Sequence, residues 1–212
     1  MKCLDAQDTL ATLALCQNRR SGALWRDLAL PGAARRPGER CAAVSDVLPL
    51  WAGVALCESE QAAALEAVRG SGLLAPGGVL TTTCSSSTQQ WDAPNAWPPL
   101  QYFLDKALRA LVLAPGARQL ADQLRDTWLH SCHTAWAHTG FVYEKMDAHR
   151  PGHHGGGGEY EPQIGFGWSI GVALQFLRDR AIDRAAQPRP SPPAPGTTLR
   201  VSPGPLSPPF RP

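Results

Sequence analysis

The stretch PPLQYFLDKALRALVLAPGARQLADQLRDTWLHSCHTAW, residues 98–136, contains two amphipathic helical patterns in succession. The first begins at Pro98 and Pro99, where a missing backbone N–H is harmless, and Ala114-Pro115-Gly116 ends it. Its apolar residues recur with the helical period at Leu100, Phe103, Leu104, Ala107, Leu108 and Leu111. A second helix is predicted from about Ala117 to Trp136. One side of it carries Leu120, Leu124, Trp128 and Ala135.

Outside this stretch the pattern is also helical. Further helices are predicted over Asp8–Cys16, over Ser59–Arg69 with Ser59 as the N-cap and Gly70 just beyond the end, and over Gly167–Arg184. Nowhere is there a convincing alternation of apolar and polar residues that would indicate a strand. The sequence therefore predicts an all-α fold of antiparallel helices, with the unusual residues placed in long loops.

Composition limits the possible classes of protein. A chain of 212 residues can bury one sizeable core, and its net charge of +2, without a basic stripe, argues against a nucleic-acid partner. No apolar stretch is long enough to cross a bilayer, and the opening MKCLDAQDTL has acids where a secretory leader would be apolar. No localisation follows. The six cysteines show no CxxC pair, and most are expected to be buried free thiols.

The C-terminal end differs from the rest in composition. Ten of the twenty prolines fall between Pro188 and Pro212, and proline disfavours both helix and central-strand geometry. We expect an ordered domain over residues 1–185, and an extended or disordered tail over 186–212. Residues 30–40, LPGAARRPGER, are expected to form a loop.

The first unusual loop is QQWDAPNAWPPLQ, residues 89–101. Two tryptophans flank an aspartate and an asparagine, and this mix suits a sugar, because indole covers the apolar face of a pyranose while carboxylate and amide groups bind its hydroxyls. The alternative is structural. Trp91 and Trp97 would then be core anchors, and Asp92 would cap the following helix.

The second unusual loop is GGGGEYEPQIGFGW, residues 155–168. Four consecutive glycines are costly unless the backbone takes unusual angles or approaches another group closely. They lead into Glu159, which could act as an acid or base, and into three aromatic residues, Tyr160, Phe166 and Trp168. No Gly-Lys-Ser/Thr follows, so this is no phosphate loop. The alternatives are a flexible linker and a solvated loop acid.

These two stretches, with VYEKMD between them, resemble the C-terminal part of the trehalases, glycoside hydrolases that split α,α-trehalose into two glucoses. Weaker likeness in LALCQN, SGALWRDL and PLWAG extends the resemblance over about residues 8 to 180. It implies a partial (α/α)6 toroid, inverting hydrolysis of trehalose or a related glucoside, and no metal or other cofactor. Glu159 corresponds to the general base. Substrate contacts are expected at Gln90, Trp91, Asp92, Asn95, Trp97, Tyr160, Phe166 and Trp168.

The general acid of the family is an aspartate in a Ser-Gly-Trp-Asp context, upstream of LALCQN, and Asp5 and Asp8 lack these neighbours. A toroid without its first helices should expose apolar faces, so a partner chain could complete it. The alternatives to an active hydrolase are a catalytically incomplete sugar-binding or interaction protein and a truncated gene model.

The histidines suggest one competing site. All six lie between residues 130 and 154, and His130 and His133 share a helix face close to Cys132. Zinc could be bound by such a group. The remaining histidines have no fixed ligand spacing, and the predicted metal set is therefore none.

Overall fold

The computed structural model describes residues 41–53, 56–85, 89–158 and 161–186. Helices make up most of this part, which confirms the all-α prediction. In chain order they are the 3-10 helix η1 (Val44–Val47), α2 (Leu48–Trp51), α3 (Glu58–Arg69), α4 (Pro98–Ala110), α5 (Ala117–Thr139) and α6 (Gly167–Ala186). The predicted helix over Asp8–Cys16 and the predicted loop over residues 30–40 lie outside the described residues. So does the tail predicted over residues 186–212, except for Ala186, which is the last residue of α6.

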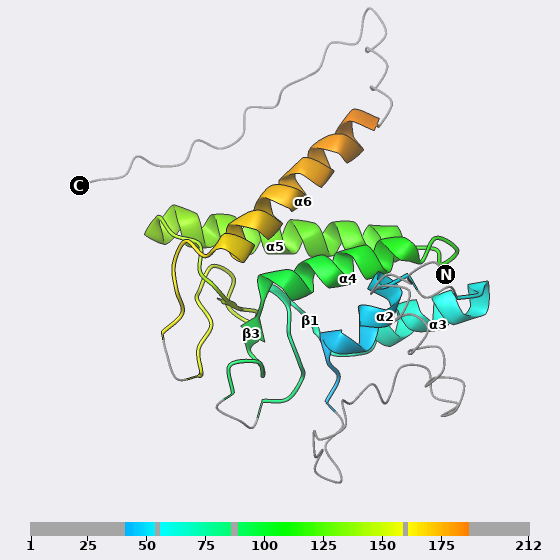
Figure 1. The fold of residues 1–212 in the computed structure, drawn as a ribbon, viewed down its shortest axis with the longest axis horizontal. Coiled ribbons are helices and arrows are strands. Elements are labelled where there is room, and N and C mark those ends of the chain that lie inside the picture. Colours follow the sequence, from blue (N-terminus) through cyan, green and yellow to red (C-terminus); the bar gives the residue numbers. More distant parts are fainter. Residues whose placement is uncertain (1–40, 54–55, 86–88, 159–160, 187–212) are drawn as a thin grey trace, which may run out of the picture.

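The predicted helical pair over residues 98–136 is present as α4 and α5. Pro98 and Pro99 occupy the first turn of α4, and the chain then turns back through a short connection that ends at Gly116, with φ +87°. Figure 1 shows α4 and α5 running side by side in opposite directions, with α6 packed across them. The second helix is longer than predicted, because the chain stays helical up to Gly140, which adopts φ +77° and ends it.

Two helix boundaries differ from the prediction. The N-cap of α3 is Cys57 rather than Ser59, and Glu58 is its first helical residue. The carboxylate of Glu60 accepts a hydrogen bond from the backbone N–H of Cys57 at 2.8 Å, which satisfies one free donor at this helix end. Helix α6 begins at Gly167 as predicted and extends two residues beyond Arg184.

Four strands of two residues each were not predicted. Strands β1 (Leu74–Ala75) and β2 (Gly78–Val79) form one antiparallel pair, and β3 (Asn95–Ala96) and β4 (Met146–Asp147) form the other. A strand of two residues is too short to show an alternating pattern, so its sequence carries no signal. The second pair joins the two loop regions identified in the sequence.

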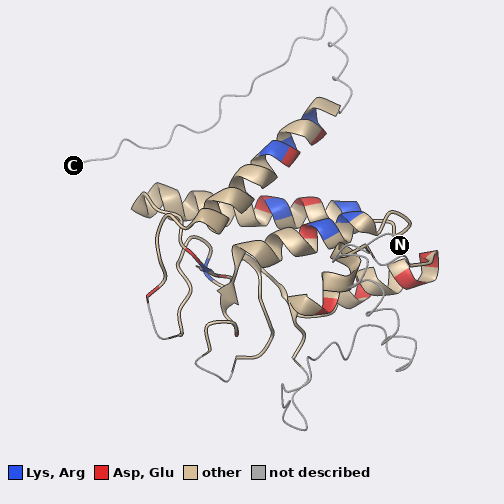
Figure 2. Ribbon diagram, viewed as in Figure 1, with Lys and Arg blue, Asp and Glu red and all other residues tan. Residues whose placement is uncertain are grey.

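Two features hold the helices together. The apolar core between α4 and α5 includes Leu104, Leu108, Leu124 and Trp128. Beside it lies a network of ion pairs. Figure 2 shows acidic and basic residues alternating along α4, α5 and α6. Arg125 of α5 is only 4% exposed, and it pairs with Asp122 at 3.0 Å and with Asp183 of α6 at 2.8 Å. Lys106 of α4 pairs with Asp179 of α6 at 2.6 Å.

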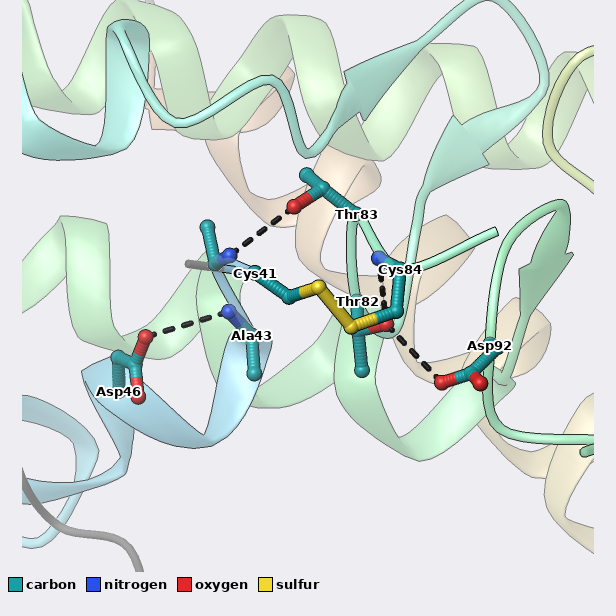
Figure 3. Close-up of a disulfide and its surroundings, with 8 residues drawn as sticks. Cys41, Ala43, Asp46, Thr82, Thr83, Cys84 and Asp92 are labelled. Atoms are coloured by element: carbon teal, nitrogen blue, oxygen red, sulfur yellow. Dashed lines mark hydrogen bonds between the residues drawn. A yellow bond between two sulfur atoms is a disulfide. The ribbon is translucent and has the colours of Figure 1, made fainter. Parts of the chain in front are cut away.

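The prediction that most cysteines are buried free thiols is wrong for the described residues. Cys41 and Cys84 form a disulfide, Cys57 is free but exposed, and only Cys132 is a buried free thiol. Burial raises the pKa of Cys132 to about 12. Figure 3 shows that the disulfide joins the segment before η1 to the loop that precedes the first motif, residues 89–101. The pairing has a sequence separation of 43 residues, and no local spacing could have revealed it.

One helix face is apolar and exposed. Ile170, Leu174 and Leu177 of α6, spaced four and three residues apart on one face, are each between 43% and 61% exposed. Such a stripe was expected of helices at the edge of an incomplete toroid. None of the helices in the described ranges is long and apolar enough to cross a membrane.

Candidate functional site

The strand pair β3–β4 brings the two loop motifs together. Asn95 of the first motif pairs with Asp147, and Ala96 pairs with Met146. The chain then turns back, and an isolated bridge between Met146 and His154 places the glycine run beside the same strand. Segments that are about sixty residues apart in the sequence therefore form one site.

The glycine run lies against the first motif, and its geometry explains the residue type. The side-chain oxygen of Asn95 accepts a hydrogen bond from the N–H of Gly156 at 2.9 Å. A Cβ on Gly155 would collide with that same oxygen, and a Cβ on Gly158 would lie 3.0 Å from Oε1 of Gln90. Gly157 and Gly158 also adopt φ +72° and +84°. Close approach and left-handed backbone both require glycine here. These contacts account for the glycines, and a flexible linker does not.

Lys145 contacts both motifs through its buried side chain. Its side chain is fully buried, and its ammonium donates hydrogen bonds to the carbonyl of Gly157 at 3.0 Å and to Oε1 of Gln90 at 3.3 Å. It also lies 5.3 Å from the centre of the Trp97 ring. Burial lowers the pKa of the Lys145 ammonium below its ordinary value, and the charge of Glu144 opposes this shift.

Four of the predicted aromatic residues form one continuous group, the aromatic cluster. Trp91 stacks on Trp97 with ring centres 4.2 Å apart, and Trp97 meets Trp168 edge to face at 5.4 Å. Phe166 packs against Trp168 at 4.8 Å. Trp91 is 44% exposed, whereas Trp97 is 1% exposed. Within the cluster, Trp91 therefore presents an indole ring to the outside, and Trp97 supports it from behind.

Asp92 does not cap the helix that follows it. The N-cap of α4 is Trp97, which has no side-chain cap bond. Instead, Oδ1 of Asp92 accepts a hydrogen bond from the hydroxyl of Thr82 at 3.2 Å, and that hydroxyl accepts one from the N–H of Cys84 at 3.0 Å. The Asp92 loop is thus connected to the disulfide, as Figure 3 shows. The structural alternative is therefore correct in one part, because Trp97 is buried as a core anchor would be. Its other part, that Asp92 caps the following helix, is wrong.

The structure describes only some of the carboxylates in and near the glycine run. Glu159 and Tyr160 lie outside the described residues. Glu161 is exposed, and Glu144 is buried at 4% exposure. The backbone carbonyl of Glu144 accepts the indole N–H of Trp168 at 3.0 Å. Glu144 thus helps to orient the aromatic cluster through its main chain.

The histidine region contains no metal-binding group among the described residues. No three or more His, Cys, Asp or Glu side chains within them come together in a way that could hold a metal, and all six histidines belong to this part of the chain. Instead, Nδ1 of His154 lies 2.8 Å from the carbonyl oxygen of Gly155, and its ring packs edge to face with Tyr143. The zinc hypothesis therefore lacks its ligands in this part of the protein.

Taken together, these contacts form a surface with an indole ring, carboxylate and amide groups, and a rigid glycine run beside them. An exposed indole favours the apolar face of a sugar, and the neighbouring polar groups suit hydroxyls. The family model for Trehalase matches residues 21–180 of this chain. The chain belongs to the trehalase family.

Individual trehalases agree with this match. The chain is 41% identical to trehalase from Apis mellifera over 136 residues, which is 63% of this chain and 22% of that protein. It is 40% identical to trehalase from Homo sapiens over 66% of this chain and 24% of the relative. Against a periplasmic trehalase from Pseudomonas aeruginosa the identity is 42%, over 68% of this chain and 25% of the relative.

A solved trehalase structure supports the fold. Neutral trehalase from Saccharomyces cerevisiae matches with a TM-score of 0.50 and 23% identity, over 66% of this chain and 24% of that one. The helices of this chain thus correspond to part of an (α/α)6 toroid. The chain spans about a quarter of the length of the trehalases it matches.

Lys145 and Thr82 belong to the site but were not predicted from the sequence. Lys145 lies inside VYEKMD, a stretch that contributed to the family resemblance without indicating a role for the lysine. Its sequence neighbours, Glu144 and Met146, give no clear signal that the lysine is buried, and only the contacts to Gly157 and Gln90 show its place. The threonine carried no signal.

Proposed function

We propose that this chain provides the C-terminal part of a trehalase active site, which binds α,α-trehalose or a related glucoside for inverting hydrolysis to glucose. The observation that carries the proposal is the hydrogen bond between Asn95 and Gly156, because it joins both trehalase-like motifs in one site. The family match and the exposed indole of Trp91 support it.

In this proposal Glu159 is the general base that activates a water molecule. Inversion requires a second carboxyl group roughly 6.5 to 9.5 Å away, which protonates the departing oxygen from the opposite face of the sugar. Trp91 stacks on a glucose ring, and Gln90 and Asp92 bind its hydroxyls. Asn95, Trp97, Phe166 and Trp168 shape the site from behind, and Tyr160 follows the base.

Glucose release from trehalose tests the enzymatic part. Mixed with the preceding part of a trehalase, which supplies the second carboxyl group, the chain should release glucose at a rate that rises with its concentration, and Glu159→Gln should abolish this release. Glu161→Gln, which changes an exposed carboxylate two residues away, is the matched control and should retain activity. Activity that survives Glu159→Gln would contradict the assigned role.

A second candidate is a chain that binds sugar without turnover by itself. It is supported by the share of the relatives that the chain spans, 22% for the bee trehalase. Titration with trehalose while recording tryptophan fluorescence separates the two candidates. A binding curve without glucose release supports the second candidate, and the absence of both contradicts either.

We also propose that the apolar stripe of α6, formed by Ile170, Leu174 and Leu177, packs against the remaining helices of a toroid supplied by a partner chain of the same family. Three large apolar side chains exposed on one helix face are costly in water, and the chain spans 22% of the length of the bee trehalase, so most of the toroid lies outside it. Light scattering of the chain mixed with the preceding part of a trehalase should show a complex, and Leu174→Glu should weaken it.

A further inference from the structure

Lys145 is the one fully buried side-chain ammonium in the described part of the chain, and it lies where three elements of the site meet. The described ranges contain one other lysine, Lys106, whose side chain is 28% exposed in an ion pair between helices. Burying an ammonium group is costly unless hydrogen bonds or other contacts compensate the loss of its hydration. For Lys145 these contacts are with the Gly157 carbonyl, the Gln90 side chain and the Trp97 ring.

We propose that Lys145 is a positioning residue that fixes the glycine run Gly155–Gly158 onto the first motif, through the contacts of its ammonium with the Gly157 carbonyl, the Gln90 side chain and the Trp97 ring. This inference rests on the proposed function, because the run leads directly into Glu159. Lys145 itself is fully buried beneath the aromatic cluster, so it acts through the loop and not on the substrate.

The geometry of the run makes such a fastening necessary. Glycines are the least constrained residues, and Gly156, Gly157 and Gly158 are all exposed on their outer side. Its inner side is fixed by the Gly155 N–H, which donates to the carbonyl of Lys145 at 3.0 Å, and by the Gly156 N–H, which donates to Asn95. Beyond Gly156, the ammonium of Lys145 bonds the Gly157 carbonyl at 3.0 Å, immediately before the chain reaches Gly158.

Lys145 also fixes the position of the Gln90 side chain, against which the glycine run lies. Its bond to Oε1 of Gln90 holds the amide that Gly158 approaches, where any larger residue would lie 3.0 Å from that oxygen. The Trp97 indole beside the ammonium adds a cation–π contact at 5.3 Å and donates its own N–H to the carbonyl of Gln90 at 2.9 Å. One ammonium thus couples the position of the run to that of the aromatic cluster.

The test compares Lys145→Met with Lys106→Met. Both changes keep an unbranched side chain and remove an ammonium that forms a salt bridge or hydrogen bonds and contacts an aromatic ring. In protein labelled with ¹⁵N-glycine, Lys145→Met should speed hydrogen exchange at the amide of Gly156 by about tenfold or more, the loss expected for bonds to a charged group. Lys106→Met should leave that rate within about twofold of the unchanged protein, because its site is separate. Lys145→Arg, which keeps charge and donors, should restore most of the protection.

The same variants are titrated with trehalose while tryptophan fluorescence is recorded, and Lys145→Met should raise the Kd where Lys106→Met does not. If the unchanged chain does not respond to trehalose, the proposed function fails, whereas the exchange rates still decide the role of Lys145. Unchanged exchange at Gly156 in a folded Lys145→Met protein overturns the inference, and so does faster exchange at every glycine. If Lys145→Met does not fold, Gln90→Leu, which changes a half-buried residue bonded to the same ammonium, takes its place. Unchanged hydrogen exchange at Gly156 in this variant then overturns the inference.

Discussion

Asn95 Oδ1 accepts a hydrogen bond from the N–H of Gly156 at 2.9 Å, across 61 residues of sequence. Asn95 is 3% exposed, and its amide nitrogen donates to the carbonyl of Asp92 at 3.0 Å. One buried amide therefore holds both its own loop and the glycine run in place.

Replacing Asn95 by alanine should lower the free energy of unfolding by about 2 kcal/mol, because the Gly156 N–H loses its acceptor. The Asp92 carbonyl loses one of its two donors and keeps the backbone N–H of residue 95. Urea unfolding measures this. Gln163→Ala, at an exposed loop position, is the control and should have little effect. A loss at Asn95 no larger than that of the control would show that the bond is unimportant.

The glycine run should distinguish two neighbouring substitutions. Gly155→Ala places a Cβ against Asn95 and 3.1 Å from Cγ of Lys145, so it should destabilise the protein by roughly 1 to 3 kcal/mol. Gly156→Ala meets no atom within 4 Å, and its effect should stay within about 0.5 kcal/mol. Thermal unfolding of both proteins checks the difference. Equal melting temperatures would contradict the packing described for this run.

The exposed indole of Trp91 should be required for sugar binding. Trp91→Ala should weaken trehalose binding about tenfold, because the stacking surface for the pyranose is lost. Trp136 of α5 is 58% exposed and lies outside the aromatic cluster, so Trp136→Ala provides a matched control. Calorimetric titration measures both affinities. A similar affinity for the two variants would exclude Trp91 as the sugar platform.

The disulfide between Cys41 and Cys84 should contribute to stability. It closes a loop with a separation of 43 residues, for which chain entropy predicts about 4 kcal/mol. Replacing both cysteines by serine should lower the free energy of unfolding accordingly, and a reducing agent should have the same effect on the original protein. Cys57→Ser, which removes an exposed free thiol, should not. Thiol titration of the unfolded protein counts the bridged cysteines independently.

Helix α6 should detach from α5 more easily at low pH. The hydrogen bond from Arg125 lowers the pKa of Asp183, with the charges of Arg125, Arg118 and Arg109 acting in the same direction. Because the native pKa lies below the unfolded value of about 3.9, this stability is fully present above that pH and is lost as pH falls through the native pKa.

Asp183→Asn should therefore cost about 1 kcal/mol at pH 7 and nothing once the pH is below the native pKa. Chemical denaturation of both proteins at a series of pH values provides the measurement. A difference between the two proteins that does not depend on pH would contradict this account.

The sequence by itself determined the four long helices α3 to α6 and the family, but not the short helices η1 and α2. The apolar period over residues 98–136 predicted α4 and α5, because a helix face is a local property of residues three and four apart. The two loop motifs likewise identified the trehalase family from their composition and order, in agreement with the family match over residues 21–180.

Only the tertiary structure decided how these parts meet. The pairing of Asn95 with Asp147 and the bridge between Cys41 and Cys84 join segments more than forty residues apart. The burial of Lys145 places a charge inside the protein. No local pattern encodes such contacts. Their energy comes from groups that become neighbours after the helices have packed. This is also why the glycines could be recognised as unusual from the sequence, whereas the atoms that require them could not.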